Sequence, residues 1–333
     1  MKKIINDPNL VVDEMLEGMV AAHPEYIKKL DNADVLVRKN SPVKGKVALV
    51  SGGGSGHEPA HGGYVGEGML DGAVAGAVFT SPTPDQIYEA IKAVDGGNGV
   101  LLVIKNYSGD VMNFEMAKDM ADMEGIKVES VVVNDDVAVE NSTFTAGRRG
   151  IAGTVFVHKI AGAKAESGAS LEEVKNVAEK VINNVRSMGM ALSSCIVPAA
   201  GKPNFTLGED EVEIGMGIHG EPGTHREKLS SADEITEHLL NKILEDMKVE
   251  SGEEVAVMVN GLSSTPLMEL YIVNKKVSEL LKEKGIKVHK TFVGEYMTSL
   301  EMAGFSISLL KLDTELKELL NAKADTPAFK MLG

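Results

Sequence analysis

The sequence has little cysteine, few aromatic residues and a shortage of positive charge. Its single cysteine, Cys195, excludes an intrachain disulfide and a multi-thiolate metal site, and it favours a reducing compartment. Aromatic residues make up 4% with no tryptophan, which leaves little material for stacking on bases. Lys and Arg total 34 against 49 Asp and Glu, a net charge of -15, and this excess of acid argues against nucleic acid or an anionic membrane surface as a partner.

Long apolar runs are also absent. No segment approaches about 18 uninterrupted apolar residues, and the N-terminus is charged but lacks the apolar core of a signal peptide. We therefore expect a cytoplasmic protein that neither spans nor binds a membrane. Hydrophobic residues nevertheless make up 43% and charged residues 25%, values typical of a globular chain, and 333 residues suffice for about two domains.

Short apolar runs alternate with helical patterns along the chain. The runs predict buried strands at residues 47–50, 73–79, 100–104, 128–133, 254–259, 287–293 and 306–310. Between two of them, Thr83 and Pro84 supply the N-cap and first position of a helix. This alternation predicts an α/β protein of two domains, with mostly parallel or mixed sheets flanked by helices and an active site between the domains.

A shift in composition near residue 188 suggests the domain boundary. Ser170 and Glu173 form a capping box for a helix whose apolar stripe includes Val185 and which we expect to end near Gly189. A glycine- and proline-rich stretch, 198–223, follows before the α/β rhythm resumes. We therefore place the first domain at 1–188 and the second at 189–333, and leave open whether the C-terminal tail returns to the first domain.

Glycine is abundant, and residues 51–59 (SGGGSGHEP) follow a predicted strand directly. In an open parallel sheet, ligands bind at the carboxyl ends of strands. The segment fits neither the G-x-G-x-x-G dinucleotide pattern nor a P-loop. Residues 57–61 (HEPAH) do match the H-E-x-x-H pattern of zinc hydrolases, in which His57 and His61 would bind zinc and Glu58 would activate water. Pro59 and the adjoining glycines argue against the helix which that pattern requires.

Two further segments carry polar side chains, one just after a strand and one among glycines. Residues 105–110 (KNYSGD) follow the strand that ends at 104, where Lys105 suits an anionic group and Asp110 suits a proton acceptor. In residues 215–223 (GMGIHGEPG), the glycines on both sides leave His219 accessible on a backbone that can adopt unusual dihedral angles. The alternative interpretations are an ordinary exposed turn and a structural histidine.

Together these segments resemble the K subunit, or K domain, of the dihydroxyacetone kinases. The resemblance covers essentially the whole chain, in blocks that occur in the same order at 52–59, 79–84, 94–97, 104–110, 145–150, 197–203, 217–223, 298–300 and 304–306. It implies that His219 adds through Nε2 to the ketone carbon and gives a hemiaminal, which selects ketones and aldehydes over polyols. A neutral histidine is needed for this attack, so binding should weaken at acid pH.

The resemblance also implies roles for the other residues of these segments. His57 is expected to act as acid or base toward the ketone oxygen, and Asp110 as the base for the hydroxyl that receives phosphate. His219, His57 and Asp110 are then the catalytic residues. The substrate-binding residues are expected to be Gly54, Ser55, Gly56, His57, Lys105, Asp110 and His219, with no metal ligand among them.

Partners follow from the same resemblance. Single-chain members of this family carry a second, helical nucleotide-binding domain, which these 333 residues do not include. The resemblance therefore implies a separate L subunit that holds ADP or ATP with magnesium, and a phosphotransferase-system M protein that recharges it from phosphoenolpyruvate. No cofactor is expected in this chain, which would be active only with its partner subunits, and a homodimer is expected.

Two other functions remain as alternatives. A non-catalytic paralogue could retain His219 to sense dihydroxyacetone and act as a co-activator of a transcription regulator. A zinc hydrolase could instead use His57, Glu58 and His61. The retention of His57, Asp110 and His219 together favours the kinase subunit.

Overall fold

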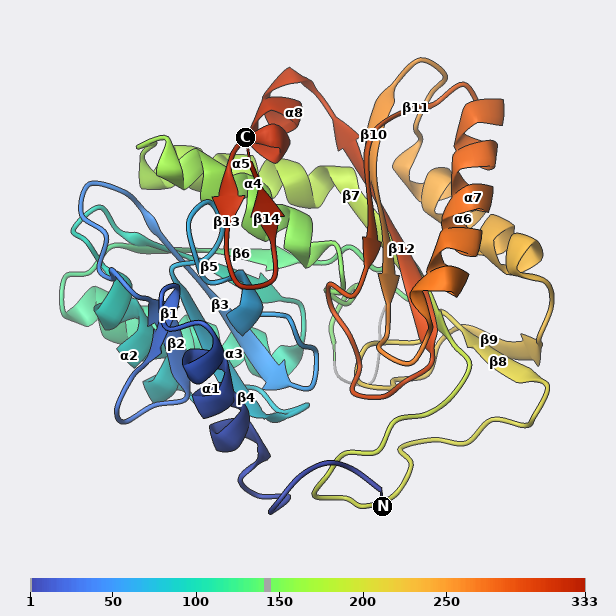
Figure 1. Ribbon diagram of the computed structural model, residues 1–333. Helices are drawn as coiled ribbons and strands as arrows, with labels where there is room; N and C mark the ends of the chain where they lie inside the picture. Colours follow the sequence, from blue (N-terminus) through green and yellow to red (C-terminus); the bar gives the residue numbers. More distant parts are fainter. Residues whose placement is uncertain (1, 141–144, 333) are drawn as a thin grey trace.

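The computed structural model describes residues 2–140 and 145–332, and within them the chain forms two six-stranded sheets separated by helices (Figure 1). Four adjacent strands of the first sheet are mutually parallel, and two further strands extend one edge of the sheet through successive antiparallel pairs. In spatial order this sheet consists of β1 (Ile27–Lys29), β2 (Val35–Arg38), β4 (Gly72–Val78), β3 (Ala48–Ser55), β5 (Val100–Lys105) and β6 (Val128–Val133).

The second sheet is largely antiparallel, and only its β10–β11 pair is parallel. In spatial order it consists of β11 (Lys287–Gly294), β10 (Glu254–Gly261), β12 (Gly304–Leu312), β7 (Val185–Ala191), β8 (Glu211–Ile214) and β9 (His225–Lys228). A small hairpin, β13 (Ala324–Asp325) with β14 (Lys330–Met331), closes the described chain. The prediction of an α/β fold with mostly parallel or mixed sheets is confirmed.

Helices cover both sheets, and one layer of them is shared. The helices are α1 (Val11–Ala22), α2 (Pro84–Val94), α3 (Ser108–Met123), α4 (Thr154–Glu166), α5 (Leu171–Asn184), α6 (Ala232–Met247), α7 (Leu267–Glu283) and α8 (Thr314–Asn321), with a 3-10 turn at Gly62–Tyr64. The first sheet packs α2 and α3 on one face and α4, α5 and α1 on the other. The second sheet packs α6 and α7 on its far face.

The alternation of side chains along each strand explains this layering. Leu102 and Ile104 of β5 pack with α2 and α3, whereas Leu101 and Val103 pack with α4 and α5. Both sets are fully or almost fully buried, which is why β5 shows a continuous apolar run instead of an alternating one. The capping box predicted for α5 forms, since the side chain of Ser170 accepts the N–H of Glu173.

Helix α4 belongs to the cores of both sheets. All but two of its residues are buried, and the apolar cluster around it also contains Ala256 and Met258 of β10 and Leu310 of β12. Helix α5 leads straight into β7, the first strand of the second sheet. The two halves are therefore joined by a common helical layer rather than by an extended linker.

Two local expectations were wrong. The predicted helix does not continue to Gly189 but ends at Asn184, because Val185 and the following residues pair with β12 over seven positions. The glycine segment is not a loop after residue 50, because β3 extends through Ser55. A Cβ on Gly52 would lie 2.4 Å from the carbonyl oxygen of Val74 on β4, so this close strand contact requires glycine.

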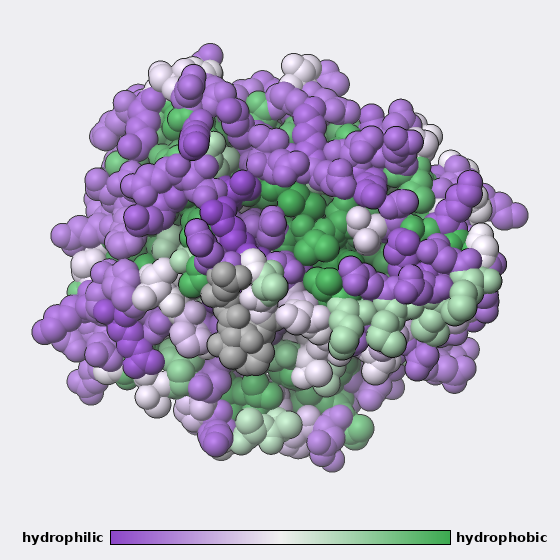
Figure 2. Space-filling model, turned by 180° about the vertical axis from the view of Figure 1, so that it is seen from behind, coloured by the Kyte–Doolittle hydropathy of each residue, from purple (hydrophilic) through white to green (hydrophobic). Residues whose placement is uncertain are grey.

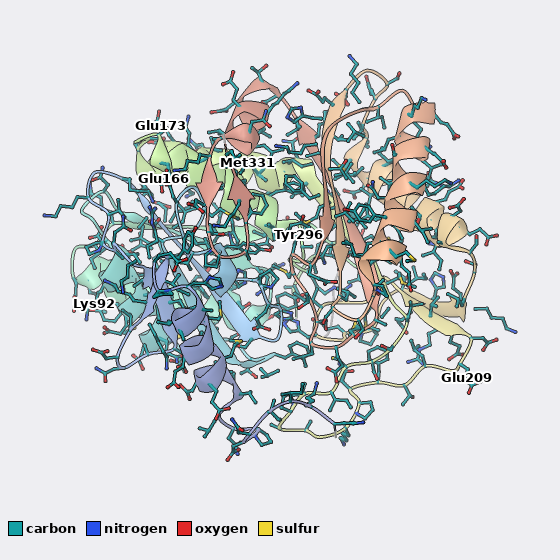
Figure 3. All side chains as sticks on the ribbon, viewed as in Figure 1. Lys92, Glu166, Glu173, Glu209, Tyr296 and Met331 are labelled. Carbon is teal, nitrogen blue, oxygen red and sulfur yellow. The ribbon has the colours of Figure 1, made fainter. Side chains whose placement is uncertain are left out.

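Residue 188, our expected domain boundary, lies within β7. The C-terminal tail reaches the first half, where the N–H of Asp325 donates to the carbonyl of Glu67 and the hydroxyl of Tyr26 donates to the Asp325 carboxylate at 2.9 Å. Side chains of both halves meet in the middle of the molecule, where Tyr296 lies (Figure 3). From behind, the surface is mostly hydrophilic, with hydrophobic residues near the centre of the face (Figure 2). No helix among the described residues is long and apolar enough to cross a membrane.

Candidate functional site

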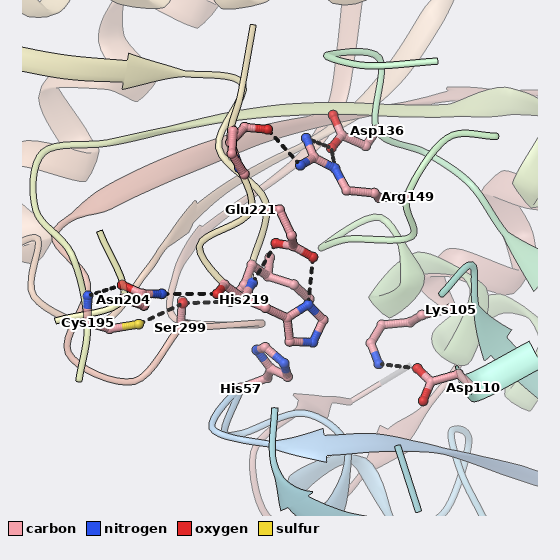
Figure 4. A network of polar contacts seen from close by, with 12 residues as sticks. His57, Lys105, Asp110, Asp136, Arg149, Cys195, Asn204, His219, Glu221 and Ser299 are labelled. Carbon is pink, nitrogen blue, oxygen red and sulfur yellow. Dashed lines mark hydrogen bonds and ion pairs between the residues drawn. The ribbon is translucent and has the colours of Figure 1, made fainter. Parts of the chain in front are cut away.

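The three segments singled out in the sequence converge on one cleft of about 650 Å³ between the halves. Strands β3 and β5 end at this cleft and bring residues of the first half, while the loop between β8 and β9 brings His219 from the second half. Its lining residues are Gly54, Phe79, Thr80, Ser81, Tyr107, Ser108, Gly109, Asp110, Asn113, His219 and Glu221. The cleft lies at the predicted location between the two halves, with His219 and Glu221 from the second half on one side and Asp110 from the first half opposite them (Figure 4).

His219 is held by the carboxylate two residues further along. Glu221 accepts the backbone N–H of His219 through Oε2 at 2.9 Å, and its Oε1 lies 2.8 Å from Nδ1 of the ring. Burial opposes ionisation of Glu221, but its contacts with His219 and the nearby Arg149 lower the pKa of Glu221 to about 2. An ionised carboxylate can only accept, so Nδ1 carries a proton, and a neutral ring held in this way has a free lone pair on Nε2.

Three rings surround the His219 imidazole. Tyr107, His57 and Phe79 lie with ring centroids 4.6, 4.7 and 5.2 Å from it, each set nearly perpendicular. Phe79 also stacks on His57 at 5.1 Å, with an angle of 16° between the planes. Edge-to-face packing of this kind restricts the rotation of the imidazole. Its side chain is still 18% exposed, which leaves a path from the cleft to the ring.

His57 is fully buried, and its Nδ1 lies 2.7 Å from the carbonyl oxygen of Thr298. Because a carbonyl oxygen only accepts, Nδ1 donates and the proton of the neutral ring is on Nδ1. Burial, together with His219 and Lys105 nearby, lowers the pKa of His57 well below its ordinary value. Its Nε2, which has no hydrogen-bond partner among the described residues, is therefore an acceptor.

Lys105 and Asp110 form a buried pair on the other side of the cleft. Lys105 ends β5, Asp110 lies in the first turn of α3, and the Nζ–Oδ2 distance is 3.5 Å. The N-terminal end of a helix favours a negative charge. The second oxygen of Asp110, Oδ1, has no partner among the described residues. Lys105 Nζ occupies the space beside Gly53, where a Cβ would lie 2.3 Å from it.

The predicted residues Gly54, Ser55 and Gly56 lie at the end of β3. Gly54 lines the cleft. The hydroxyl of Ser55 donates to the carbonyl of Gly76 on β4 at 2.7 Å, and the N–H of Gly56 donates to Glu58 at 3.0 Å. The side chain of Ser55 is thus occupied in joining strands, and its backbone carbonyl accepts the N–H of Phe79 at 3.0 Å.

The H-E-x-x-H segment forms turns and not a helix. His57 faces His219, whereas Nδ1 of His61 lies 2.9 Å from Nε2 of His158 on α4. Within residues 2–140 and 145–332, no three His, Cys, Asp or Glu side chains gather in a way that could hold a metal ion.

Four residues that contact the ring of His219 or His57 were not identified as site residues from the sequence: Phe79, Tyr107, Glu221 and Thr298. Glu221 stands two residues after His219, and a carboxylate at this spacing across a glycine turn was the one available signal. Tyr107 lies within residues 105–110 and Phe79 begins the block 79–84, but an aromatic residue at the end of a strand is ordinary core material. Thr298 is 241 residues from His57, and the block 298–300 gave no sign of a contact between them.

Comparison with known proteins identifies relatives over nearly the full length. A sequence model described as the Dak1 domain matches residues 17–328. The dihydroxyacetone-binding subunit of a PTS-dependent dihydroxyacetone kinase from Listeria innocua is 58% identical, over 99% of this chain and 100% of its own length.

Solved structures show the same fold. A dihydroxyacetone kinase operon co-activator is 38% identical with a TM-score of 0.90, covering 96% of this chain and 98% of its own. The dihydroxyacetone kinase of C. freundii, in complex with AMP-PNP and Mg2+, is 34% identical with a TM-score of 0.91. That alignment covers 99% of this chain and 61% of the longer kinase.

Proposed function

This chain belongs to the Dak1 domain family, and from this premise we propose that it binds dihydroxyacetone as the substrate-binding subunit of a dihydroxyacetone kinase. The observation that carries the proposal is the arrangement of His219, whose Nε2 is left free by the Glu221 carboxylate at the edge of the cleft. A relative that is 58% identical bears the corresponding name. The expected product is dihydroxyacetone phosphate.

The proposed anchoring step is a reversible addition to the ketone. The Nε2 lone pair of His219 forms a bond to the carbonyl carbon, and the C=O π pair becomes a lone pair on oxygen. That oxygen takes a proton from water in the cleft, while the Nδ1 proton passes to Glu221 and on to solvent, so the hemiaminal is neutral overall. A three-carbon ketone offers at most about 1.5 kcal/mol of binding per heavy atom, and a covalent bond adds specificity for carbonyl compounds.

His57 acts in this scheme as a hydrogen-bond acceptor and base. Its Nδ1–H is committed to Thr298, and burial keeps the ring neutral, so Nε2 receives a hydrogen bond from a substrate hydroxyl. The sequence left acid and base roles open for His57. The donor–acceptor pattern favours the base.

Asp110 is the proposed base for the hydroxyl that receives phosphate. Its Oδ1 has no partner among the described residues, whereas Oδ2 lies 3.5 Å from Lys105, which orients the carboxylate. Lys105 also places a positive charge beside the substrate oxygens. Backbone groups of Gly54, Ser55 and Gly56 are proposed to contact the substrate from the end of β3.

The phosphoryl donor is assigned to a partner. We propose a separate L subunit that carries ADP or ATP with magnesium and is recharged through a phosphotransferase-system M protein, with phosphoryl transfer at the interface. The PTS-dependent name of the relative supports this assignment. The residues of this chain bind and orient the ketone and accept the hydroxyl proton. A homodimer in the cytoplasm is part of the same proposal.

The test reconstitutes this chain with the L subunit from its own genomic neighbourhood and a phosphoryl donor. Formation of dihydroxyacetone phosphate is measured for the native chain, Asp110→Ala and His219→Ala. We expect turnover by the native chain, a loss of about 100-fold or more in Asp110→Ala, and loss of ketone binding in His219→Ala.

A second candidate function is supported by one comparison. The operon co-activator is similar over 98% of its own length, so this scaffold also occurs in a protein named as a regulator. Binding of dihydroxyacetone that depends on His219, without turnover in the reconstituted system, would refute the catalytic proposal and favour a ketone sensor.

A further inference from the structure

A buried ion pair lies directly behind the loop that carries His219. Arg149 and Asp136 are both fully buried, and Nε and Nη2 of the guanidinium lie 2.8 and 2.7 Å from Oδ2 of Asp136. Both residues belong to the connection between β6 and α4, on the first half of the molecule. Arg149 crosses to the second half and donates to the carbonyl of Gly215 at 2.7 Å.

The remaining nitrogen of this guanidinium, Nη1, donates to the carbonyl of Pro222 at 3.4 Å and faces Glu221. Arg149 Nη1 and Glu221 Oε2 lie 2.6 and 2.1 Å from one point, the position that a Cβ on Gly217 would take. They are therefore close enough for a strong electrostatic interaction in a buried setting. Any side chain at 217 would come between them, so glycine at this position permits their close approach.

The charge on Glu221 decides which nitrogen of His219 is reactive. As a carboxylate, Glu221 can only accept, and the ring proton stays on Nδ1. As a carboxylic acid it could donate to Nδ1, and the ring proton would then move to Nε2, which removes the lone pair that attacks the ketone. A carboxyl group that is only 3% exposed favours the neutral form unless a positive charge is near.

We propose that Arg149 is a positioning residue, which keeps Glu221 ionised and thereby holds His219 in the tautomer with a free Nε2. The inference rests on the proposed function of His219. In this arrangement Asp136 has a different role from Arg149. It makes burial of the guanidinium tolerable and fixes its direction, but its own negative charge does not favour the carboxylate of Glu221.

Other ionisable groups around Glu221 do not replace Arg149. His219 is on the same loop as Glu221 and is neutral when it reacts. The other ionisable groups near Glu221 are Tyr107, just before α3, and His57, just after β3. The burial of His57 disfavours a positive charge there. Arg149 is thus the permanent cation of this group.

The test compares two substitutions that break the same ion pair and change the charge near Glu221 in opposite directions. Arg149→Met removes the positive charge, whereas Asp136→Asn removes the negative charge and retains an acceptor for Nε. Arg148→Met is the matched control, because Arg148 pairs with Asp246 at 2.9 Å, away from the cleft. Since burial raises the pKa of Asp136 to about 6 although Arg149 opposes this, all samples are studied at about pH 8.

Two measurements are made on the full chain without partners. Long-range proton–nitrogen spectra of ¹⁵N-histidine protein report the tautomer of His219, with His219→Ala identifying its signals among the 8 histidines. The carbonyl signal of dihydroxyacetone labelled with ¹³C at the ketone carbon then reports adduct formation and affinity. The first measurement needs no ligand and does not depend on the adduct.

In Arg149→Met we expect the His219 proton to shift toward Nε2 and the affinity to fall about tenfold or more. Asp136→Asn and Arg148→Met should retain the native tautomer and an affinity within about threefold. If Arg149→Met does not fold, Arg149→Gln replaces it, and Arg149→Lys should restore the native tautomer.

A native tautomer and affinity in the neutral Arg149 variants would overturn the inference. An equal shift in Asp136→Asn would overturn it as well, because the ion pair would then act through geometry alone. Absence of an adduct in the native chain would refute the proposed function instead, while the tautomer measurement would still decide the role of Arg149.

Discussion

Replacing Glu221 with glutamine should impair adduct formation even though the two side chains have nearly the same shape. Both carboxylate oxygens accept from the same residue, Oε2 from the backbone N–H of His219 at 2.9 Å and Oε1 from its ring at 2.8 Å. A glutamine has one acceptor oxygen and one donor NH2 group. Whichever way the amide is turned, it cannot accept both of these hydrogen bonds.

The two orientations of the amide have different consequences. With its oxygen toward the backbone N–H, the NH2 group donates to Nδ1 and leaves the ring proton on Nε2. With its oxygen toward the ring, two donors face each other at the backbone of His219. A buried polar group without its partner costs about 2 kcal/mol, so Glu221→Gln should weaken dihydroxyacetone binding about 30-fold.

The assay is titration with dihydroxyacetone labelled with ¹³C at the ketone carbon, in which the adduct is seen directly. Glu213→Gln is the matched control, because Glu213 is also buried and anchors the same loop through the N–H of Gly223 at 2.9 Å, but does not touch His219. We expect its affinity to stay within about threefold of native. Equal affinities for Glu221→Gln and the native chain would refute the proposed role of the carboxylate.

Three further predictions concern stability and the opposite wall of the cleft. Burial lowers the pKa of Lys159 from 10.5 to about 8, and Lys290 adds to the effect. Between these two pH values the unfolded chain binds more protons than the folded chain. The buried charge therefore destabilises the fold fully below pH 8, and this cost is lost by pH 10.5. Lys159→Met should therefore raise the free energy of unfolding at neutral pH by about 2 kcal/mol, measured by urea denaturation, and a gain that did not shrink at alkaline pH would contradict this cause. Gly53→Ala should lower the rate of phosphorylation at least about tenfold, because the new Cβ would lie 2.3 Å from Lys105 Nζ. Gly125→Ala is the control, since Gly125 also has a positive φ but has nothing within 4 Å of the Cβ position. It should cost about 1 kcal/mol of stability and leave turnover intact. Burial lowers the pKa of His158 from 6.5 to about 3. As the pH falls, the unfolded state therefore takes up this proton first, and the stability of the fold should decrease below pH 6.5. A urea midpoint that stayed constant down to about pH 5, or an equally steep decline in His158→Gln, would show that His158 is not responsible.

Local sequence patterns predicted those helix and strand boundaries that depend on residues close together in the sequence. Helix α2 begins where Thr83 and Pro84 predict, because capping depends on residues three positions apart. The extension of β3 through its glycines was not predictable, since it depends on how closely β4 approaches Gly52. The end of α5 was missed for a related reason. Val185 fits an apolar helical stripe and a buried strand equally well, and pairing with β12 decides between them.

In the candidate site, too, some features were predictable from the sequence and others depend on contacts between distant residues. The positions of His57, Asp110 and His219 were identified from segments at strand ends and from a family resemblance, and the structure brings all three to one region. The direction in which each ring donates was not accessible, because it depends on Thr298 and Glu221 as partners. Arg149 contacts a carbonyl 66 positions away, and such a contact exists only in the folded chain.

The sharing of α4 between the two cores has a consequence for motion. If the halves swung apart to admit a ligand, α4 would have to separate from one of the sheets and expose apolar surface that is now buried, at about 25 cal/mol for each Å². Hinge opening is therefore costly, and the walls of the cleft are held at a nearly constant spacing. A ketone bound as proposed would meet preorganised walls of the cleft, so little of its small binding energy would be spent on ordering the protein.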